Sequence, residues 1–494
     1  MRQLGLVLVV TLLTFGIFTS QSLAQVSPWP MFQHDQLHTG RTTVAGPTQA
    51  GTPWTRDLDG NTVGVNNAPV IGNNGAVLIG TVQGGVYAYS ASGTRLWKVT
   101  LPGGVTAPLA VAANGRILAP TNNDSCYVLD PANGNILQRL FLGQLNTGAT
   151  MVGNDAYVSG NYNGAGFVFR IDMQALWYTG QSGHLWHIDR SIPMVTLGGQ
   201  IAVGTTENLV PYNSSGHVSI LDANCQELCS FNLDFFNGRG VRSTVSQTST
   251  GRIVGGSAGD QSSYYGDGAF FNTDVTCAGC KPSAGHYFSS PALTSSNVIV
   301  IGTKYGLSLR DPAGCGQTAL YSTGPILNPS PVIDGKGAIY VGDDNGKLWA
   351  WSAAGSNLWS MQLNAAATGI AIDGFGNLFI ASTAGRLYRF AGSGAVAVGS
   401  TDSPTTDRLS LWPNPVKHTT SIQLVLAHNE TVNCAVYDLS GRPIATIFRG
   451  PLAAGSWSWA WNGHDDRGQL LPPGIYWATA HIGSRRITRT VVLL

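Results

Sequence analysis

Apolar and polar residues alternate in short runs along most of this chain, and the order of the runs recurs. Residues 75–99 read GAVLIGTVQGGVYAYSASGTRLWKV, in which two alternating runs precede a glycine turn and a Leu-Trp run. Residues 337–361 repeat the glycines, the aromatic pair and the Leu-Trp at the same places. Period-two runs separated by glycine turns predict short antiparallel strands. A unit of this size cannot bury its own apolar face, so its repetition predicts a ring or a stack of like units.

Each clear unit is predicted to hold four strands, with small residues on the inner ones. The inner strands begin near Ala68, Ala107, Ala149, Ile192, Ser243, Ser290, Ser330 and Thr368, which gives eight units. Four short strands per unit predict an all-β fold, an eight-bladed β-propeller. Insertions at Thr205–Ser215 and Ala258–Gly268 blur the middle units and leave the count open by one.

The eighth unit has three strands and lacks the Leu-Trp run. Residues 51–58, GTPWTRDL, resemble an isolated fourth strand with no unit before it. We therefore expect this N-terminal strand to complete the eighth blade and close the ring, which removes two open sheet edges.

The propeller is expected to span residues 28–394, with a Gly/Ser/Thr-rich linker at 395–407. Residues 408–494 carry further alternating runs, enough for a small Ig-like β-sandwich. At the other end, residues 1–24 have a basic start, an apolar stretch and small residues before Ala24, which predicts a cleaved signal peptide. A membrane anchor is the alternative, but the stretch is short for a span. The mature chain is expected to have no membrane span.

Composition excludes some partners. Glycine accounts for 63 of 494 residues and charged residues for 11%, as expected for a turn-dense β protein. Lys and Arg total 27 against 26 Asp and Glu, so nothing predicts binding to nucleic acid. The chain is expected to act as a monomer.

Seven cysteines are present, and export permits disulfides. Cys225 with Cys229, and Cys277 with Cys280, are close in sequence, and each pair is predicted to clip one hairpin. A zinc site built from all four is the less favoured alternative.

The blade endings at residues 89–97, 129–137 and 351–359 resemble the D-x-x-T-G-x-x-x-W motif of the PQQ-binding-like (quinoprotein dehydrogenase-like) β-propeller family. The leader at residues 29–41, WPMFQHDQLHTGR, is similar to the segment that opens many such propellers. The resemblance implies the fold. It implies little about chemistry, because the family includes scaffold proteins as well as dehydrogenases.

The tail resembles the C-terminal sorting domain of type IX secretion cargo, whose pattern overlaps with FlgD-type Ig-like domains. The matching residues are LWPNP at 411–415, YDLSGR at 437–442, WNGHDDRG at 461–468 and LPPGIY at 471–476. The resemblance implies engagement of the type IX machinery and delivery to the cell surface or beyond.

A propeller binds ligands where loops lead into its inner strands. These loops carry Asn66, Asn67, Thr106, Asn146, Thr147, Asp189, Arg190, Arg242, Ser289 and Asn328. From these we select Asn67, Thr106, Asp189, Arg190, Arg242 and Asn328 as candidate ligand-binding residues. Two arginines at similar places in neighbouring blades can hold an anion. The alternative is that each pairs with a local carboxylate or carbonyl.

In the leader, His34, Asp35 and His38 suggest a metal or acid–base cluster, but we favour packing across the propeller. No catalytic or metal-binding residue is assigned. The favoured function is a non-enzymatic exported scaffold that binds a protein or a glycan without a cofactor. The alternative is a PQQ-dependent quinoprotein-type oxidoreductase, which would need calcium held by acidic residues. Only Asp189 stands out among the inner-loop positions.

Overall fold

The computed structural model describes residues 29–145, 147–183, 185–206, 216–233, 240–257, 269–284, 289–311, 317–326, 328–392, 407–412, 416, 420–426, 430–452, 455–461, 463–466 and 469–493. The predicted signal peptide at 1–24 and nearly all of the predicted linker at 395–407 lie outside these residues. The described residues contain strands and turns but no helix, and hence no helix able to span a membrane.

Between Trp54 and Phe390, the described strands form eight four-stranded antiparallel sheets, which confirms the predicted all-β class and the four-strand unit. The first four sheets in chain order are β2 (Val70–Ile71), β3 (Val77–Gly80), β4 (Gly85–Tyr89), β5 (Arg95–Thr100); β6 (Ala110–Val111), β7 (Ile117–Pro120), β8 (Ser125–Leu129), β9 (Ile136–Phe141); β10 (Ala149–Val152), β11 (Asp155–Tyr162), β12 (Ala165–Asp172), β13 (Trp177–Gln181); and β14 (Met194–Val195), β15 (Ile201–Thr206), β16 (Gly216–Leu221), β17 (Glu227–Asn232).

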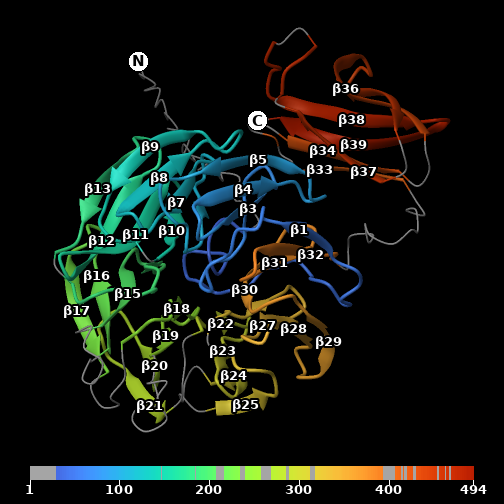
Figure 1. Ribbon diagram of the computed structural model, residues 1–494. Coiled ribbons are helices and arrows are strands. Elements are labelled where there is room, and N and C mark those ends of the chain that lie inside the picture. The colour runs from blue at the N-terminus through green and yellow to red at the C-terminus, as the bar shows by residue number, and fades with distance from the viewer. Residues whose placement is uncertain are drawn as a thin grey trace, which may run out of the picture.

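Three further sheets follow the same order of strands. They are β18 (Ser246–Gln247), β19 (Ile253–Gly256), β20 (Ala269–Thr273), β21 (Cys280–Ala284); β22 (Ala292–Leu293), β23 (Ile299–Thr303), β24 (Gly306–Arg310), β25 (Gln317–Tyr321); and β26 (Val332–Ile333), β27 (Ile339–Gly342), β28 (Lys347–Trp351), β29 (Asn357–Gln362). Figure 1 shows the sheets arranged around a common centre, with β10, β18 and β22 on the inner side of their sheets.

The remaining sheet joins the two ends of this region. It contains β30 (Ala367–Ile372), β31 (Leu378–Ser382), β32 (Arg386–Phe390) and, as its outer strand, β1 (Trp54–Asp57). Trp54 pairs with Arg389 and Asp57 with Arg386. The N-terminal strand therefore occupies the place that the sequence predicts for it.

The recurring Leu-Trp run has a structural explanation. Trp97 is buried, and its indole Nε1 donates a 3.0 Å hydrogen bond to the carbonyl oxygen of Pro131, in the last turn of the next sheet. Gly134 in that turn has a φ of 76°, and an added Cβ there would meet the ring of Trp97. The tryptophan of one unit thus packs on the glycine turn of the next unit.

The leader, Trp29–Gly46, runs past the inner strands in turn. Its backbone carbonyl oxygens accept hydrogen bonds from the N–H of the last residue of six inner strands: Ile71, Val111, Val195, Gln247, Leu293 and Ile333, at 2.7–3.0 Å. The free edges of these strands are thereby covered. The leader lies at the end of the central space where the inner strands finish.

The cysteines pair differently from the prediction. Cys229 on β17 forms a disulfide with Cys277, which lies in the turn between β20 and β21 of the next sheet. Cys225 is a buried free thiol and Cys277 is bonded to Cys229, so both predicted hairpin clips, Cys225–Cys229 and Cys277–Cys280, are wrong. The reason is that the two sulfurs face opposite sides of the sheet: Cys225 packs with Tyr157, while Cys229 packs with Phe271. The disulfide also removes Cys229 and Cys277 as zinc ligands, and Cys280 is disulfide-bonded too.

The C-terminal strands form two antiparallel sheets around a separate core. One sheet contains β33 (Arg408–Trp412), β34 (Thr420–Leu426) and β37 (Gly455–Trp461); the other contains β35 (Glu430–Tyr437), β36 (Pro443–Leu452), β38 (Gly474–Ile482) and β39 (Arg485–Leu493). Their shared core includes Ile422, Val436, Trp461 and Ala478. This is the predicted Ig-like sandwich.

Candidate ligand-binding site

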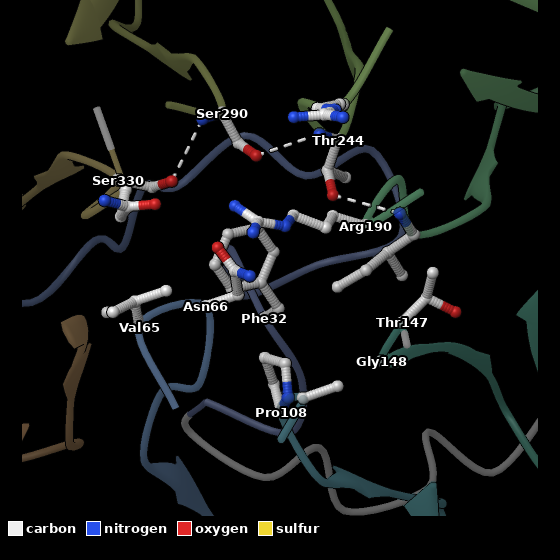
Figure 2. Close-up of a pocket in the computed structure, with 15 residues that line it drawn as sticks. Phe32, Val65, Asn66, Pro108, Thr147, Gly148, Arg190, Thr244, Ser290 and Ser330 are labelled. Atoms are coloured by element: carbon white, nitrogen blue, oxygen red, sulfur yellow. Dashed lines mark hydrogen bonds between the residues drawn. The ribbon is translucent and has the colours of Figure 1, made fainter. Parts of the chain in front are cut away.

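A pocket opens at the centre of the eight sheets, at the end where the inner strands begin; we call it the central pit (Figure 2). It encloses about 520 Å³, counting the space open to solvent. The residues that line it are Phe32, Val65, Asn66, Ala107, Pro108, Thr147, Gly148, Arg190, Ile192, Arg242, Thr244, Ser290, Asn328, Ser330 and Gly369. Phe32 comes from the leader, which lies at the far end of the inner strands.

The wall of the pit follows the repeat. Seven sheets each contribute one residue that lies in the inner strand or just before it, and we call these the wall residues. They are Ala107, Gly148, Ile192, Thr244, Ser290, Ser330 and Gly369. Arg190, Arg242 and Asn328 each lie two residues before a wall residue. Asn66 lies two residues before Ala68, the same place in the first unit. We call these four the rim residues, and Figure 2 shows Arg190 and Asn66 extending toward the middle of the pit.

Arg190 and Arg242 share one carboxylate. Asp189 Oδ2 lies 2.9 Å from Nε of Arg242, and Asp189 Oδ1 lies 3.8 Å from Nε of Arg190. The two arginine side chains remain about one third exposed, at 36% and 33%. Among the described lining residues they are the only charged ones, so the pit itself is cationic.

Arg190 has a φ of 70°, a left-handed backbone that a residue other than glycine adopts at a cost of roughly 1–2 kcal/mol. Such strain persists where surrounding contacts impose it, and it concentrates at functional sites. The neighbouring contacts here are strong: Ile188 N donates to Asn161 Oδ1 at 2.9 Å, and Ile192 N donates to Thr244 Oγ1 at 3.1 Å.

Three wall hydroxyls form a relay from sheet to sheet. Thr244 Oγ1 accepts from Ile192 N, Ser290 Oγ accepts from Thr244 N at 2.9 Å, and Ser330 Oγ accepts from Ser290 N at 3.0 Å (Figure 2). Each oxygen is thus used as an acceptor of a backbone N–H. The O–H group of each residue remains available as a hydrogen-bond donor, so this side of the pit can donate hydrogen bonds to a ligand.

Residues between the rim and the wall have a different role; we call them the anchor residues. Each bonds a backbone group on the second strand of its own sheet. Asn67 donates to Gly80 O, Thr147 to Ser159 O, Ser243 to Gly256 O and Thr368 to Ala381 O, while Ser191 and Ser289 accept from the N–H of Gly204 and Gly302. These contacts hold the loops that carry the rim.

The six selected candidates therefore separate. Arg190, Arg242 and Asn328 line the pit, and Asp189 lies behind the two arginines as their shared partner. Asn67 is fully buried as an anchor residue, and half-buried Thr106 turns its carbonyl oxygen toward Gly64. Asn328 donates to Asp344 Oδ1 at 2.8 Å.

Asn66, Thr244, Ser290 and Ser330 also line the pit, and they are not among the six residues that the sequence predicts. The spacing of the repeat could have identified Asn66. It occupies the same position in its unit as Arg190, Arg242 and Asn328 do in theirs, whereas Asn67 lies one residue later.

The leader histidine with the deepest burial serves packing. His38 is fully buried, its Nε2 lies 2.6 Å from Thr150 Oγ1, and burial lowers its pKa to about 4. Asp35 accepts hydrogen bonds from the backbone N–H groups of Leu37 and Thr39. No group of three or more His, Cys, Asp or Glu able to hold a metal ion occurs among the described residues.

The fold and the pit define an all-β chain of the β-propeller class followed by an Ig-like sandwich. Residues 40–270 match the family model described as outer membrane protein assembly factor BamB, and residues 416–484 match the FlgD Ig-like domain. No curated protein is a significant match.

Several solved structures share the propeller fold at low identity. BamB from Moraxella catarrhalis is 14% identical with a TM-score of 0.50, covering 70% of this chain and 98% of its own. Quinohemoprotein alcohol dehydrogenase from Comamonas testosteroni is 12% identical with a TM-score of 0.58, covering 79% and 83%. A europium-containing methanol dehydrogenase is 10% identical with a TM-score of 0.60, covering 74% and 98%. At such identities the likeness concerns the fold alone.

Proposed function

We propose that this chain is an exported, non-enzymatic binding protein that works as a monomer. Its eight sheets are the blades of a propeller spanning residues 28–394 and closed by β1. A linker at 395–407 joins the propeller to a sorting domain at 408–494. The central pit and the loops around it form the binding surface for a protein or glycan partner.

The observation that carries this proposal is the donor character of the central pit. Two guanidinium groups, two amide side chains and three hydroxyls face it, and no described Asp or Glu lines it. Such a lining binds an oxygen-rich or anionic group. The described lining holds no carboxylate, so the proposal assigns ligand binding and no catalytic step to the pit.

The alternative is a PQQ-dependent oxidoreductase, and the fold shared with quinohemoprotein alcohol dehydrogenase is the reason to consider it. The described lining does not fit a calcium-bound quinone. Calcium takes several carboxylate and carbonyl oxygens, whereas no described Asp or Glu lines the pit and Asp189 is already paired with two arginines. No catalytic step is therefore derived through this cofactor.

A titration of the purified full-length chain with PQQ in calcium-containing buffer tests the choice. We expect no saturable change in quinone absorbance and no rise in melting temperature. Saturable binding with a clear thermal shift would favour the oxidoreductase.

The route of export is the second part of the proposal. The BamB-type propeller, the sequence of residues 1–24 and the FlgD-type sandwich support export through the inner membrane and then type IX delivery to the cell surface or the medium. The proposal predicts that residues 408–494 carry the second step.

Localisation of two chains in a host with a type IX system tests it. The full-length chain should reach the surface or medium, and a chain ending at Gly394 should stay in the periplasm. A reporter fused to residues 395–494 should travel with the tail. Surface delivery of the truncated chain would overturn the sorting role.

A further inference from the structure

Exposed aromatic side chains form a row beside the central pit. Phe141 and Tyr162 contact edge to face with ring centroids 6.4 Å apart, and Trp186 stacks on His217 at 5.9 Å with an interplanar angle of 19°. Phe141, Tyr162 and Trp186 are 62%, 51% and 44% exposed. Large aromatic rings held open to solvent in this way mark a contact surface. We call Phe141, Tyr162 and Trp186 the aromatic row.

Backbone hydrogen bonds hold the row in one continuous ribbon. Gln144 and Asn161 exchange hydrogen bonds at 2.8 and 2.9 Å, Gly166 and Leu185 exchange them at 3.0 and 2.9 Å, and Thr206 N donates to His187 O at 2.7 Å. The segment 185–187 therefore lies as an extra strand between β12 and β15, which belong to neighbouring sheets. The aromatic side chains rest on a fixed backbone, so little ordering is needed when a ligand binds.

The row and the pit are built from the same loops. Trp186 and Arg190 lie four residues apart, so their Cα atoms are separated by no more than roughly 14 Å. Phe141 ends β9, and the loop that follows it supplies Thr147 and Gly148 to the pit. A single elongated ligand can thus contact both.

The chemistry of the two parts indicates the ligand. Arg190 and Arg242 suit a carboxylate, because guanidinium forks bind it in a bidentate manner. Asp189 pairs with both arginines and Asp344 accepts from Asn328 Nδ2, but neither carboxylate is among the residues that line the pit. The aromatic rings present electron-rich faces, and the C–H groups of a pyranose ring, which carry partial positive charge, stack on such faces.

A protein partner fits the row less well. The row consists of three exposed rings, and the exposed polar residue Gln144 pairs with Asn161 beside it. A stable protein interface needs a broad apolar centre of several hundred Å² per partner. A chain of sugar rings needs only a narrow strip.

We propose that the central pit and the aromatic row together bind an acidic oligosaccharide, with one uronate carboxylate on Arg190 and Arg242 and the adjoining sugar rings on Trp186, Tyr162 and Phe141. This inference rests on the proposed binding function and names the class of partner for that same surface.

Calorimetric titration of the full-length chain tests the inference. The probes are a galacturonic acid trimer, the same trimer with its carboxylates reduced to alcohols, and a hexa-aspartate peptide. The variants are Arg190→Gln with Arg242→Gln, and Trp186→Ala. The matched controls are Arg95→Gln, another ion-paired exposed arginine, and Trp177→Ala, a 55% exposed tryptophan that stacks on Tyr178 outside the row.

We expect the acidic trimer to bind at least tenfold more tightly than the reduced trimer. The double arginine variant should lose that preference, Trp186→Ala should weaken binding of both sugars about tenfold, and the two controls should leave binding unchanged. Circular dichroism and melting temperature establish that each variant is folded.

Three results would overturn the inference: no binding of either trimer, equal binding to the Trp177→Ala and Trp186→Ala variants, or tighter binding of the peptide than of the acidic trimer. The last result would assign the surface to an acidic protein. The PQQ titration and the localisation experiment do not depend on sugar binding, so they judge the proposed function separately.

Discussion

Asp189 Oδ2 lies 2.9 Å from Nε of Arg242, so one carboxylate joins the loop before β14 to the loop before β18. The two side chains are 25% and 33% exposed. Solvent screening limits the contribution of such a pair to roughly 0–1 kcal/mol of stability. The main effect of Asp189 therefore concerns the charge of the central pit.

Replacing Asp189 with asparagine keeps the size of the side chain and removes its negative charge. We expect the galacturonic acid trimer to bind several-fold more tightly to this variant, because the carboxylate no longer repels an anionic ligand. The melting temperature should change little. Calorimetry at two salt concentrations checks this, and the gain should shrink at high salt. Weaker binding would instead mean that Asp189 serves to orient the arginines.

Asn66 and Asn67 are adjacent, yet their substitution by alanine should affect the free energy of unfolding to very different extents. Asn67 is fully buried, donates to the carbonyl oxygens of Gly80 and Val105, and accepts from the N–H of Ala68. Its loss leaves buried backbone groups without partners, which costs about 1–3 kcal/mol. Asn66→Ala should stay within about 0.5 kcal/mol of the parent. Urea unfolding of both variants decides whether the anchor and rim roles are correctly assigned.

The Cys229–Cys277 disulfide links two neighbouring sheets across 48 residues. In the chain-entropy model a closed loop of this length contributes about 4 kcal/mol. The Cys229→Ser/Cys277→Ser variant should therefore unfold at a clearly lower denaturant concentration than the oxidised parent. Each single variant should be about as destabilised as the double variant, because each breaks the same link. Unchanged unfolding would show that the link does not restrain the unfolded chain.

Gly40 and Gly51 form a matched pair for testing the leader. Both have positive φ, at 60° and 55°. An added Cβ at Gly40 would collide with Gln33 and Ala292, whereas the space around Gly51 is open. Gly51→Ala should cost roughly 1–2 kcal/mol for the left-handed backbone alone. Gly40→Ala should cost more, because the leader must also move from the inner strands. Thermal unfolding distinguishes the two, and equal losses would refute the close packing of the leader.

His38 should make stability dependent on pH. Burial lowers its folded pKa to about 4 from an ordinary value of 6.5, so the unfolded chain binds a proton that the folded chain excludes. Its contribution is present above about pH 6.5 and is lost as the pH falls toward 4. The loss should total roughly 3 kcal/mol. Melting curves of His38→Asn, which tolerates the φ of 52°, should show a weaker loss between pH 7 and 4.5 than the parent.

The repeat is the part of this molecule that its sequence predicts best. Alternation and glycine spacing lead to the four-stranded sheets, and the unpaired run around Trp54 leads to its partner strand β32. These features are local, or are copied from unit to unit, and so leave a periodic trace.

The site and the cysteines are harder to predict for a physical reason. Asn66 and Asn67 differ by one position, and a shift of one residue in an extended loop turns a side chain from the pit to the scaffold. Cys225 and Cys229 are near in sequence but lie on opposite faces of one sheet. Sequence proximity therefore suggests a bond that the structure does not contain, because Cys225 lies in the turn before β17 while Cys229 on β17 bonds Cys277 of the next sheet.

The path of the leader has a consequence for how the chain reaches its native state. Residues 29–46 form backbone hydrogen bonds with inner strands as distant in sequence as the one that contains Ile333. Strand β1 likewise pairs with β32, near the end of the propeller region. The first residues of the chain thus find their partners only when the last units exist. Sheets can form one after another, but the contacts that secure them are the longest in sequence and the slowest to close. If the chain crosses a membrane N-terminus first, β1 has no partner until β32, which ends at Phe390, has also crossed. The pairing of β1 with β32 would then be the last step of folding.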